Sequence, residues 1–136
     1  MAIDLPPDPV PPACVWQSAE KYGINPVIIA AIIHVEGGKP GRIHWNRNGT
    51  YDIGPMQINS IWIPRLRHYG VTYRAIKNDP CANVDAGSWI LANQLRETHG
   101  DLWKAVGRYH SPHKREAWRY ISQVWNTVRK LLGSTR

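Results

Sequence analysis

Glu36 is the residue whose type and position most directly suggest chemistry. It is the last residue of the segment 26–36, which predicts a helix capped by Asn25. This helix is apolar on every side, which is typical of a helix in the centre of a core. Burial and the negative end of the helix dipole would both raise the pKa of its carboxyl, as a general acid working near neutral pH requires. The helix alone leaves open an ordinary glutamate that turns into solvent beside Gly37 and Gly38.

A second carboxylate, Asp52, lies in the segment 48–59, whose sequence predicts a turn, a strand and another turn. Such a segment can carry Asp52 back across a cleft toward Glu36. Two carboxyl groups facing each other across a cleft are the usual equipment for cleaving a glycosidic bond, one as acid and the other as nucleophile or electrostatic stabiliser. Without further information, Asp52 is equally consistent with a turn residue that hydrogen-bonds its own backbone.

Helical patterns flank this segment and predict an α+β architecture that is mostly helical. A small β-hairpin or irregular lobe is expected between Gly38 and Pro55. Ser60, Asp79 and Asp101 are predicted to begin or cap helices. The expected helices cover residues 13–22, 26–36, 60–69, 80–99, 101–109 and 112–132.

The last predicted helix combines apolar and basic residues. Its apolar residues recur at spacings of three and four, which favours packing of Trp118 and Trp125 in the core. The basic residues, among them Arg119 and Arg129, would then form a solvated face. The alternative is a nucleic-acid-binding surface made of the same residues.

The 136 residues are the usual size of one domain. We expect a proline-rich arm over 1–12, one catalytic domain over 13–132 and a short tail over 133–136. The longest apolar run, 27–33, is far shorter than the roughly 20 residues needed to cross a bilayer. The first residues do not resemble a signal peptide, so an exported chain would have lost its leader.

The charge and the cysteines limit the classes of partner. A net charge of +7 favours an anionic partner such as nucleic acid, a phospholipid surface or cell wall, although a basic surface that only aids solubility is equally consistent. Cys14 and Cys81 lack the spacing of zinc ligands, which favours a disulfide in an oxidising compartment over a metal site. Two separate buried thiols are the alternative.

His110 and His113 do not suggest a metal site either, because Pro112 interrupts any helical register between them and Glu116. We therefore expect neither a metal nor another cofactor.

Three motifs resemble, in order and spacing, those of soluble lytic transglycosylases with a goose-lysozyme-like (SLT) catalytic domain. They are His34-Val35-Glu36-Gly37-Gly38, Asp52-Ile53-Gly54-Pro55-Met56-Gln57-Ile58-Asn59 and Gly107-Arg108-Tyr109-His110-Ser111. The resemblance covers about residues 13–132 and implies a lysozyme-like fold. The segment 48–60 also resembles animal C-type lysozymes. The region around Cys81, with Cys14 and Asp52, is most similar to the small periplasmic transglycosylases of type IV and type III secretion and conjugative pili.

The resemblance implies that the chain cleaves the bond between N-acetylmuramic acid and N-acetylglucosamine in peptidoglycan, releasing 1,6-anhydro products without consuming water. Glu36 would protonate the glycosidic oxygen and then accept a proton from the C6 hydroxyl of the muramoyl sugar. Tyr109 would hydrogen-bond or orient Glu36. The implied substrate contacts are Gln57, Met56, Tyr109, Asn59 and Trp45.

The resemblance also implies a monomer in the periplasm or otherwise exported, that opens the wall locally for a secretion or pilus apparatus. Components of that apparatus are expected as partners, and nucleic acid is not.

Three residues depart from the family pattern: Gly37 replaces a serine, Pro55 a leucine and His110 an asparagine. These changes bear on the substrate contacts more than on the acid. Asp52 is an additional carboxylate that most lytic transglycosylases lack, and it opens a hydrolytic route like that of lysozyme. A glycan-binding module without catalytic activity is a further alternative.

Overall fold

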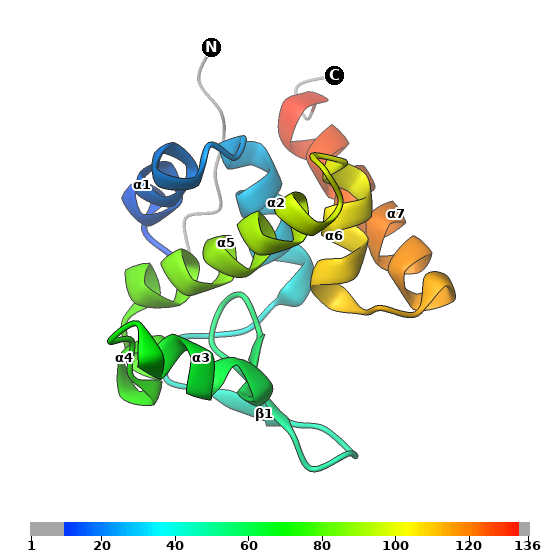
Figure 1. Ribbon diagram of the computed structural model, residues 1–136. Helices are drawn as coiled ribbons and strands as arrows, with labels where there is room; N and C mark the ends of the chain where they lie inside the picture. The colour runs from blue at the N-terminus through cyan, green and yellow to red at the C-terminus, as the bar shows by residue number, and fades with distance from the viewer. Residues whose placement is uncertain (1–9, 134–136) are drawn as a thin grey trace.

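The computed structural model describes residues 10–133. Most of the helices form one body, and a small lobe with a β-sheet projects from it (Figure 1). This is the mostly helical α+β fold that the sequence predicts. No helix within residues 10–133 is long and apolar enough to cross a membrane.

Helix α2 (Pro26–Glu36) occupies the centre of the helical body. Asn25 caps it by accepting a hydrogen bond from the backbone N–H of Val27, and Pro26 stands at the first helical position, where no N–H is needed. The seven residues from 27 to 33 are all buried, in agreement with the apolar sequence. Gly37 ends the helix in the left-handed conformation, with φ +69°. Glu36 is therefore held at the end of a rigid, fully packed element.

A disulfide joins two helices that pack against each other. Helix α1 (Pro12–Tyr22) lies along α5 (Pro80–Glu97), and Cys14 is bonded to Cys81, which confirms the favoured interpretation of the cysteines. Asp79 caps α5 as predicted, accepting hydrogen bonds from two backbone N–H groups of its first turn. Val10 is also buried in the core. Most of the predicted arm, residues 1–9, lies outside the described residues.

Helices α6 (Leu102–His110) and α7 (Lys114–Gly133) complete the body. Asp101 caps α6 as predicted, and α7 packs against both α6 and α2. The buried seam of α7 consists of Tyr120, Val124 and Val128. The prediction that its tryptophans pack in the core is wrong: Trp118 is 67% exposed and Trp125 is 47% exposed.

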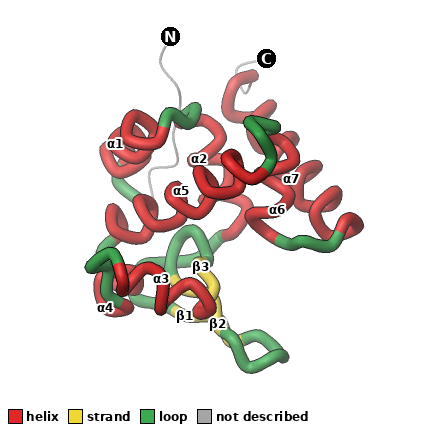
Figure 2. Tube along the Cα trace, in the orientation of Figure 1, coloured by secondary structure: helices red, strands yellow, loops and turns green. Residues whose placement is uncertain are grey.

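The small lobe contains a three-stranded antiparallel sheet in the order β1 (Ile43–Trp45), β2 (Tyr51–Ile53), β3 (Ile58–Asn59), shown in yellow in Figure 2. The predicted hairpin is the β1–β2 pair. The short helices η1 (Ser60–Trp62), α3 (Ile63–His68) and α4 (Tyr73–Asn78) follow the sheet.

Two details of this lobe differ from the sequence prediction. The cap before η1 is Asn59, which accepts from the N–H of Ile61, whereas Ser60 accepts from the N–H of Tyr51 on β2. Helix α4, which the sequence did not predict, is only six residues long and is capped by Thr72. So short a helix has little apolar periodicity to detect.

The buried amide of Asn83 on α5 connects the lobe to the body. Its Nδ2 donates to the carbonyl oxygens of Ile53 and Ile76, at 2.9 and 3.0 Å, and its Oδ1 accepts from the N–H of Met56 at 2.9 Å. One side chain thereby satisfies three backbone groups on two segments of the lobe. These bonds fix the turn between β2 and β3 relative to the helices.

Candidate active site

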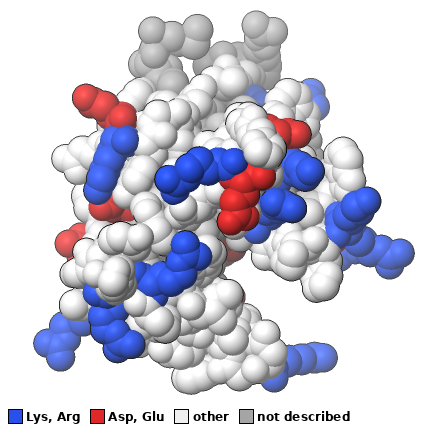
Figure 3. Space-filling model, in the orientation of Figure 1, with Lys and Arg blue, Asp and Glu red and all other residues white. Residues whose placement is uncertain are grey.

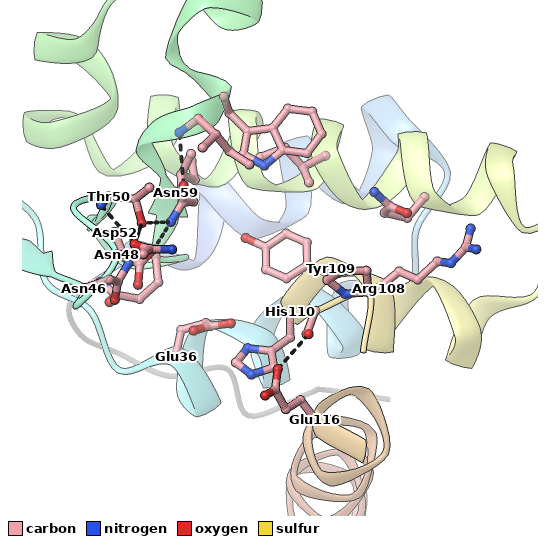
Figure 4. A pocket seen from close by; sticks show the side chains of 18 of the residues that line it. Glu36, Asn46, Asn48, Thr50, Asp52, Asn59, Arg108, Tyr109, His110 and Glu116 are labelled. Atoms are coloured by element: carbon pink, nitrogen blue, oxygen red, sulfur yellow. Dashed lines mark hydrogen bonds between the residues drawn. The ribbon is translucent and has the colours of Figure 1, made fainter. Parts of the chain in front are cut away.

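A cleft of about 800 Å³ lies between the lobe and the helical body, and Glu36 and Asp52 both line it. Figure 3 shows the indentation on the surface, and Figure 4 shows the side chains inside it. Glu36 enters from the end of α2, whereas Asp52 belongs to strand β2. The predicted arrangement of two carboxyl groups in one cleft is therefore present.

Glu36 has the environment of a general acid. Its pKa is raised from 4.5 to about 7, and burial is the main cause. The hydrogen bond from Tyr120 lowers the pKa, and the negative charge of Asp52 adds a smaller rise. The carboxyl group is thus close to half protonated at neutral pH, where it can both give and accept a proton. The alternative of a glutamate turned freely into solvent does not fit this burial.

Tyr120 holds the carboxyl group of Glu36. Its hydroxyl donates a 2.7 Å hydrogen bond to Oε2 of Glu36, and burial keeps the pKa of this phenol well above 10, so that it remains a donor. The imidazole of His110 stacks on the Tyr120 ring, with centroids 4.6 Å apart and planes within 4° of parallel. Sequence reasoning missed Tyr120. Its place on the buried seam of α7 was the available clue, because a buried tyrosine hydroxyl usually has a partner.

Tyr109, which was predicted to hydrogen-bond or orient Glu36, makes a different contact. Its hydroxyl donates to the backbone carbonyl oxygen of Met56 at 2.8 Å. It therefore links α6 to the turn of the lobe, while its ring lines the cleft near Glu36. The hydrogen bond to Glu36 comes from α7 instead.

Asp52 is oriented by its cross-strand neighbour. Asn59, which pairs with Asp52 in the sheet, donates from Nδ2 to Oδ1 of Asp52 at 3.0 Å. The same amide nitrogen donates to the hydroxyl of Thr50, which in turn bonds to Asn46 and Asn48. This polar network forms the lobe side of the cleft (Figure 4).

Gln57 lines the cleft, as expected of a substrate contact. Its backbone has φ +51°, and its side-chain amide donates to the carbonyl oxygen of Gly54 at 2.9 Å. Gly38 lies directly against this turn: a Cβ at Gly38 would come within 1.9 Å of the Gly54 oxygen and 2.4 Å of Gln57 Nε2. The absence of a side chain at Gly38 therefore lets the chain after Glu36 pass close to the β2–β3 turn.

Two predicted substrate contacts are not in the cleft lining. The side chain of Met56 is fully buried and packs against Gly87, where a Cβ would come within 2.5 Å of the Met56 sulfur. Met56 contributes to the site through its backbone carbonyl. Trp45 is exposed on β1 and packs against Tyr51, with ring centroids 4.8 Å apart, outside the cleft lining.

Several lining residues were not predicted from the sequence. Trp62, at the end of η1, lines the cleft and lies under the guanidinium group of Arg65, 5.0 Å from its ring centroid. The helical side of the cleft is lined by Gln94, Glu97, Arg108, His110 and Glu116. Within residues 10–133 there is no group of three or more His, Cys, Asp or Glu side chains that could hold a metal ion.

Comparison with known proteins agrees with this geometry. The model of the family "Transglycosylase SLT domain" matches residues 13–127. The chain is 38% identical over 124 residues to "Invasion protein IagB" of Salmonella typhimurium, covering 87% of this chain and 77% of that protein. It is 30% identical over 127 residues to "Protein IpgF" of Shigella flexneri, covering 89% of this chain and 83% of that protein.

A third similar protein is the "Peptidoglycan-binding-like protein" of Escherichia coli O157:H7, 32% identical over 107 residues, which covers 73% of this chain and 64% of that protein. The family match includes Glu36, Asp52 and Tyr120. The chain therefore belongs to the family of SLT-domain transglycosylases.

Proposed function

We propose that this protein is a peptidoglycan lytic transglycosylase in which Glu36 is the catalytic acid and base. The observation that carries the proposal is the cleft-lining Glu36, whose pKa is raised to about 7 by burial and whose carboxyl is held by Tyr120. A binding module has no need of such an acid, because hydrogen bonds to sugar hydroxyls do not depend on a shifted carboxyl pKa. Membership of the SLT family supports the choice of substrate.

In the proposed reaction, protonated Glu36 donates its proton to the glycosidic oxygen between N-acetylmuramic acid and N-acetylglucosamine, and the C1–O bond breaks. The positive charge that develops at C1 is stabilised by the neighbouring N-acetyl group of the sugar and by the carboxylate of Asp52. The Glu36 carboxylate then takes the proton of the C6 hydroxyl, whose oxygen bonds to C1. The product is a 1,6-anhydro sugar, and Glu36 returns to its protonated form.

Hydrolysis is the second candidate, and Asp52 is the observation that favours it. Retaining glycosidases use a second carboxylate as nucleophile or electrostatic stabiliser before water attacks. Here Asp52 lines the same cleft as Glu36, and Asn59 holds one of its oxygens. The two routes differ in their products, since hydrolysis adds one water to each cleaved bond.

The setting of the reaction is also a proposal. A relative named as an invasion protein supports a role in opening the cell wall locally for a secretion or pilus apparatus. The disulfide between Cys14 and Cys81 supports action in an oxidising compartment such as the periplasm. Components of the apparatus would be its partners there.

Mass spectrometry of the muropeptides released from purified sacculi tests the reaction. We expect 1,6-anhydro muropeptides, lighter by one water than the products of a lysozyme. The variant Glu36→Gln should release none, whereas the control Glu97→Gln, which changes another cleft carboxylate, should retain activity. Products with a reducing-end muramic acid would instead establish the hydrolytic route. Activity of Glu36→Gln within about tenfold of the wild type would exclude Glu36 as the acid.

A further inference from the structure

Helix α7 carries an apolar stripe on its exposed side. Trp118, Trp125 and Leu132 are 67%, 47% and 56% exposed. They are spaced seven residues apart, which is close to two full helical turns, so the three side chains lie in one row. The row extends over about 21 Å of helix, from the rise of 1.5 Å per residue. We call it the α7 stripe.

The core does not account for this stripe. The seam that packs on α2 and α6 contains Tyr120, Val124 and Val128, which differ in helical position from the stripe. Trp118 and Tyr120 are two residues apart, which places them about 160° apart around the helix. Tyr120 points inward to Glu36, whereas Trp118 points outward. Trp125 is supported from behind by Trp103 of α6, at 5.4 Å between ring centroids.

Basic residues flank the stripe along the same helix. Viewed down the helix axis, four basic residues lie to one side of the stripe, in the order Arg129, Arg115, Arg119 and Lys130. Lys114 lies at the start of α7. All five are exposed, and the helix has a single acidic residue, Glu116. Figure 3 shows Lys and Arg side chains along the edge of the molecule that α7 forms. The exposed side of α7 is thus a row of tryptophan and leucine next to a row of positive charge.

We propose that the α7 stripe and its basic flank bind the surface of an anionic phospholipid membrane. Tryptophan prefers the boundary between lipid headgroups and acyl chains, and basic residues are attracted to anionic headgroups. An interfacial helix needs only one apolar row facing the lipid. A stable protein interface, by contrast, buries roughly 800 Å² on each partner, and three partly exposed side chains offer only on the order of half that area.

The cleft is left free in this arrangement, because Trp118 lies nearly opposite Tyr120, the residue through which α7 contacts the cleft residue Glu36. The protein would lie on the membrane through the outer side of α7 while Glu36 and Asp52 face glycan in the cleft. Enzyme bound in this way would cut wall close to the membrane surface. No membrane-spanning segment is required for this placement.

Co-sedimentation with lipid vesicles tests the proposal. The wild-type protein should sediment with vesicles made of equal parts phosphatidylglycerol and phosphatidylcholine at about 0.15 M salt, but not with pure phosphatidylcholine, and binding should weaken as salt increases. Trp118→Ser should weaken binding about tenfold, and Trp118→Ser/Trp125→Ser by more. Arg119→Gln/Arg129→Gln should also weaken it at least tenfold.

Matched controls come from elsewhere on the surface. Trp16 on α1 is 47% exposed, as is Trp125, so Trp16→Ser should bind as the wild type does. Arg67→Gln/Arg74→Gln removes the same charge from α3 and α4 and should have a small effect. Trp118→Ser should cleave soluble glycan fragments as fast as the wild type does. That result would demonstrate that the variant is folded.

Several results would overturn the proposal. These are equal binding to neutral and anionic vesicles, equal losses in Trp16→Ser and Trp118→Ser, or no sedimentation of the wild type. Two further results with Trp118→Ser would also overturn it, both with vesicle binding unchanged. One is loss of binding to purified sacculi, and the other is loss of self-association in analytical ultracentrifugation. Those two results would assign the stripe to glycan or to a second copy of the chain.

Discussion

The hydroxyl of Tyr120 donates a 2.7 Å hydrogen bond to Oε2 of Glu36, joining the buried seam of α7 to the end of the central helix α2. The two residues are 84 positions apart in the chain. Burial and this hydrogen bond act in opposite directions on the pKa of Glu36, and burial has the larger effect. The pKa of the acid is therefore a balance that single substitutions can move either way.

Replacing Tyr120 by phenylalanine should raise the pKa of Glu36, because the hydrogen bond that stabilises the carboxylate is lost. The alkaline limb of the pH profile of kcat/KM should move to higher pH. Activity at its optimum should fall about tenfold, since the carboxyl group is no longer held in one position. Tyr109→Phe is the control: it loses a bond to a backbone carbonyl and should leave the limb in place. An unshifted limb in Tyr120→Phe would show that the hydrogen bond does not tune the acid.

Replacing Asp52 by asparagine should move the same limb in the opposite direction. The negative charge of Asp52 raises the pKa of Glu36, so its removal should lower that pKa and shift the alkaline limb to lower pH. Turnover should fall by about ten- to a hundredfold but persist, because the N-acetyl group of the substrate still stabilises the positive charge. Complete loss of turnover, with the fold intact by circular dichroism, would instead indicate that Asp52 is an obligatory nucleophile.

Glu36 should also make the free energy of unfolding depend on pH. Its pKa is about 7 in the folded protein, above the value near 4.5 of an unperturbed glutamate, so the folded state binds the proton more tightly. The stability that protonation gives is fully present below pH 4.5 and is lost as pH rises through 7, by about 3 kcal/mol.

Urea unfolding of wild type and Glu36→Gln from pH 4 to 8 measures this loss. The variant should match the wild type near pH 4 and exceed its stability at pH 8, because glutamine never ionises. Parallel curves for the two proteins across this range would contradict the raised pKa.

Sequence predicted the position of Glu36 well, because the evidence for it is local. Asn25, Pro26 and Gly37 set the limits of α2, and the apolar run between them requires burial on every side. Asp52 was predicted to share a cleft with Glu36, and the structure brings the two together.

Long-range partners were not predictable in the same way. Nothing near Glu36 in the chain indicates Tyr120, and Met56 is buried because Gly87, 31 residues later, leaves room for it. The spacing of apolar residues in α7 is compatible with two buried rows, one that contains Val124 and one that contains Trp125. Only the positions of α2 and α6 decide which of them is covered.

The two glycines after Glu36 lack a side chain for different structural reasons, and substitution by alanine should therefore affect them differently. Gly37 has φ +69° with no atom near its missing Cβ, so Gly37→Ala should cost about 1 to 2 kcal/mol of backbone strain and leave the site otherwise in place. In Gly38→Ala the new methyl would overlap the backbone oxygen of Gly54, at 1.9 Å, and the amide of Gln57. A backbone atom cannot move aside as a side chain can, so the β2–β3 turn must shift away from Glu36.

We expect Gly38→Ala to lose at least a hundredfold in kcat/KM, because a displacement of about 1 Å in a catalytic site is enough for such a loss. Gly37→Ala should stay within about tenfold of the wild type and show only a lower unfolding midpoint. Measuring both variants for activity and thermal unfolding separates strain from displacement. Equal activity of the two variants would mean that the turn after Asp52 does not need its close approach to the end of α2.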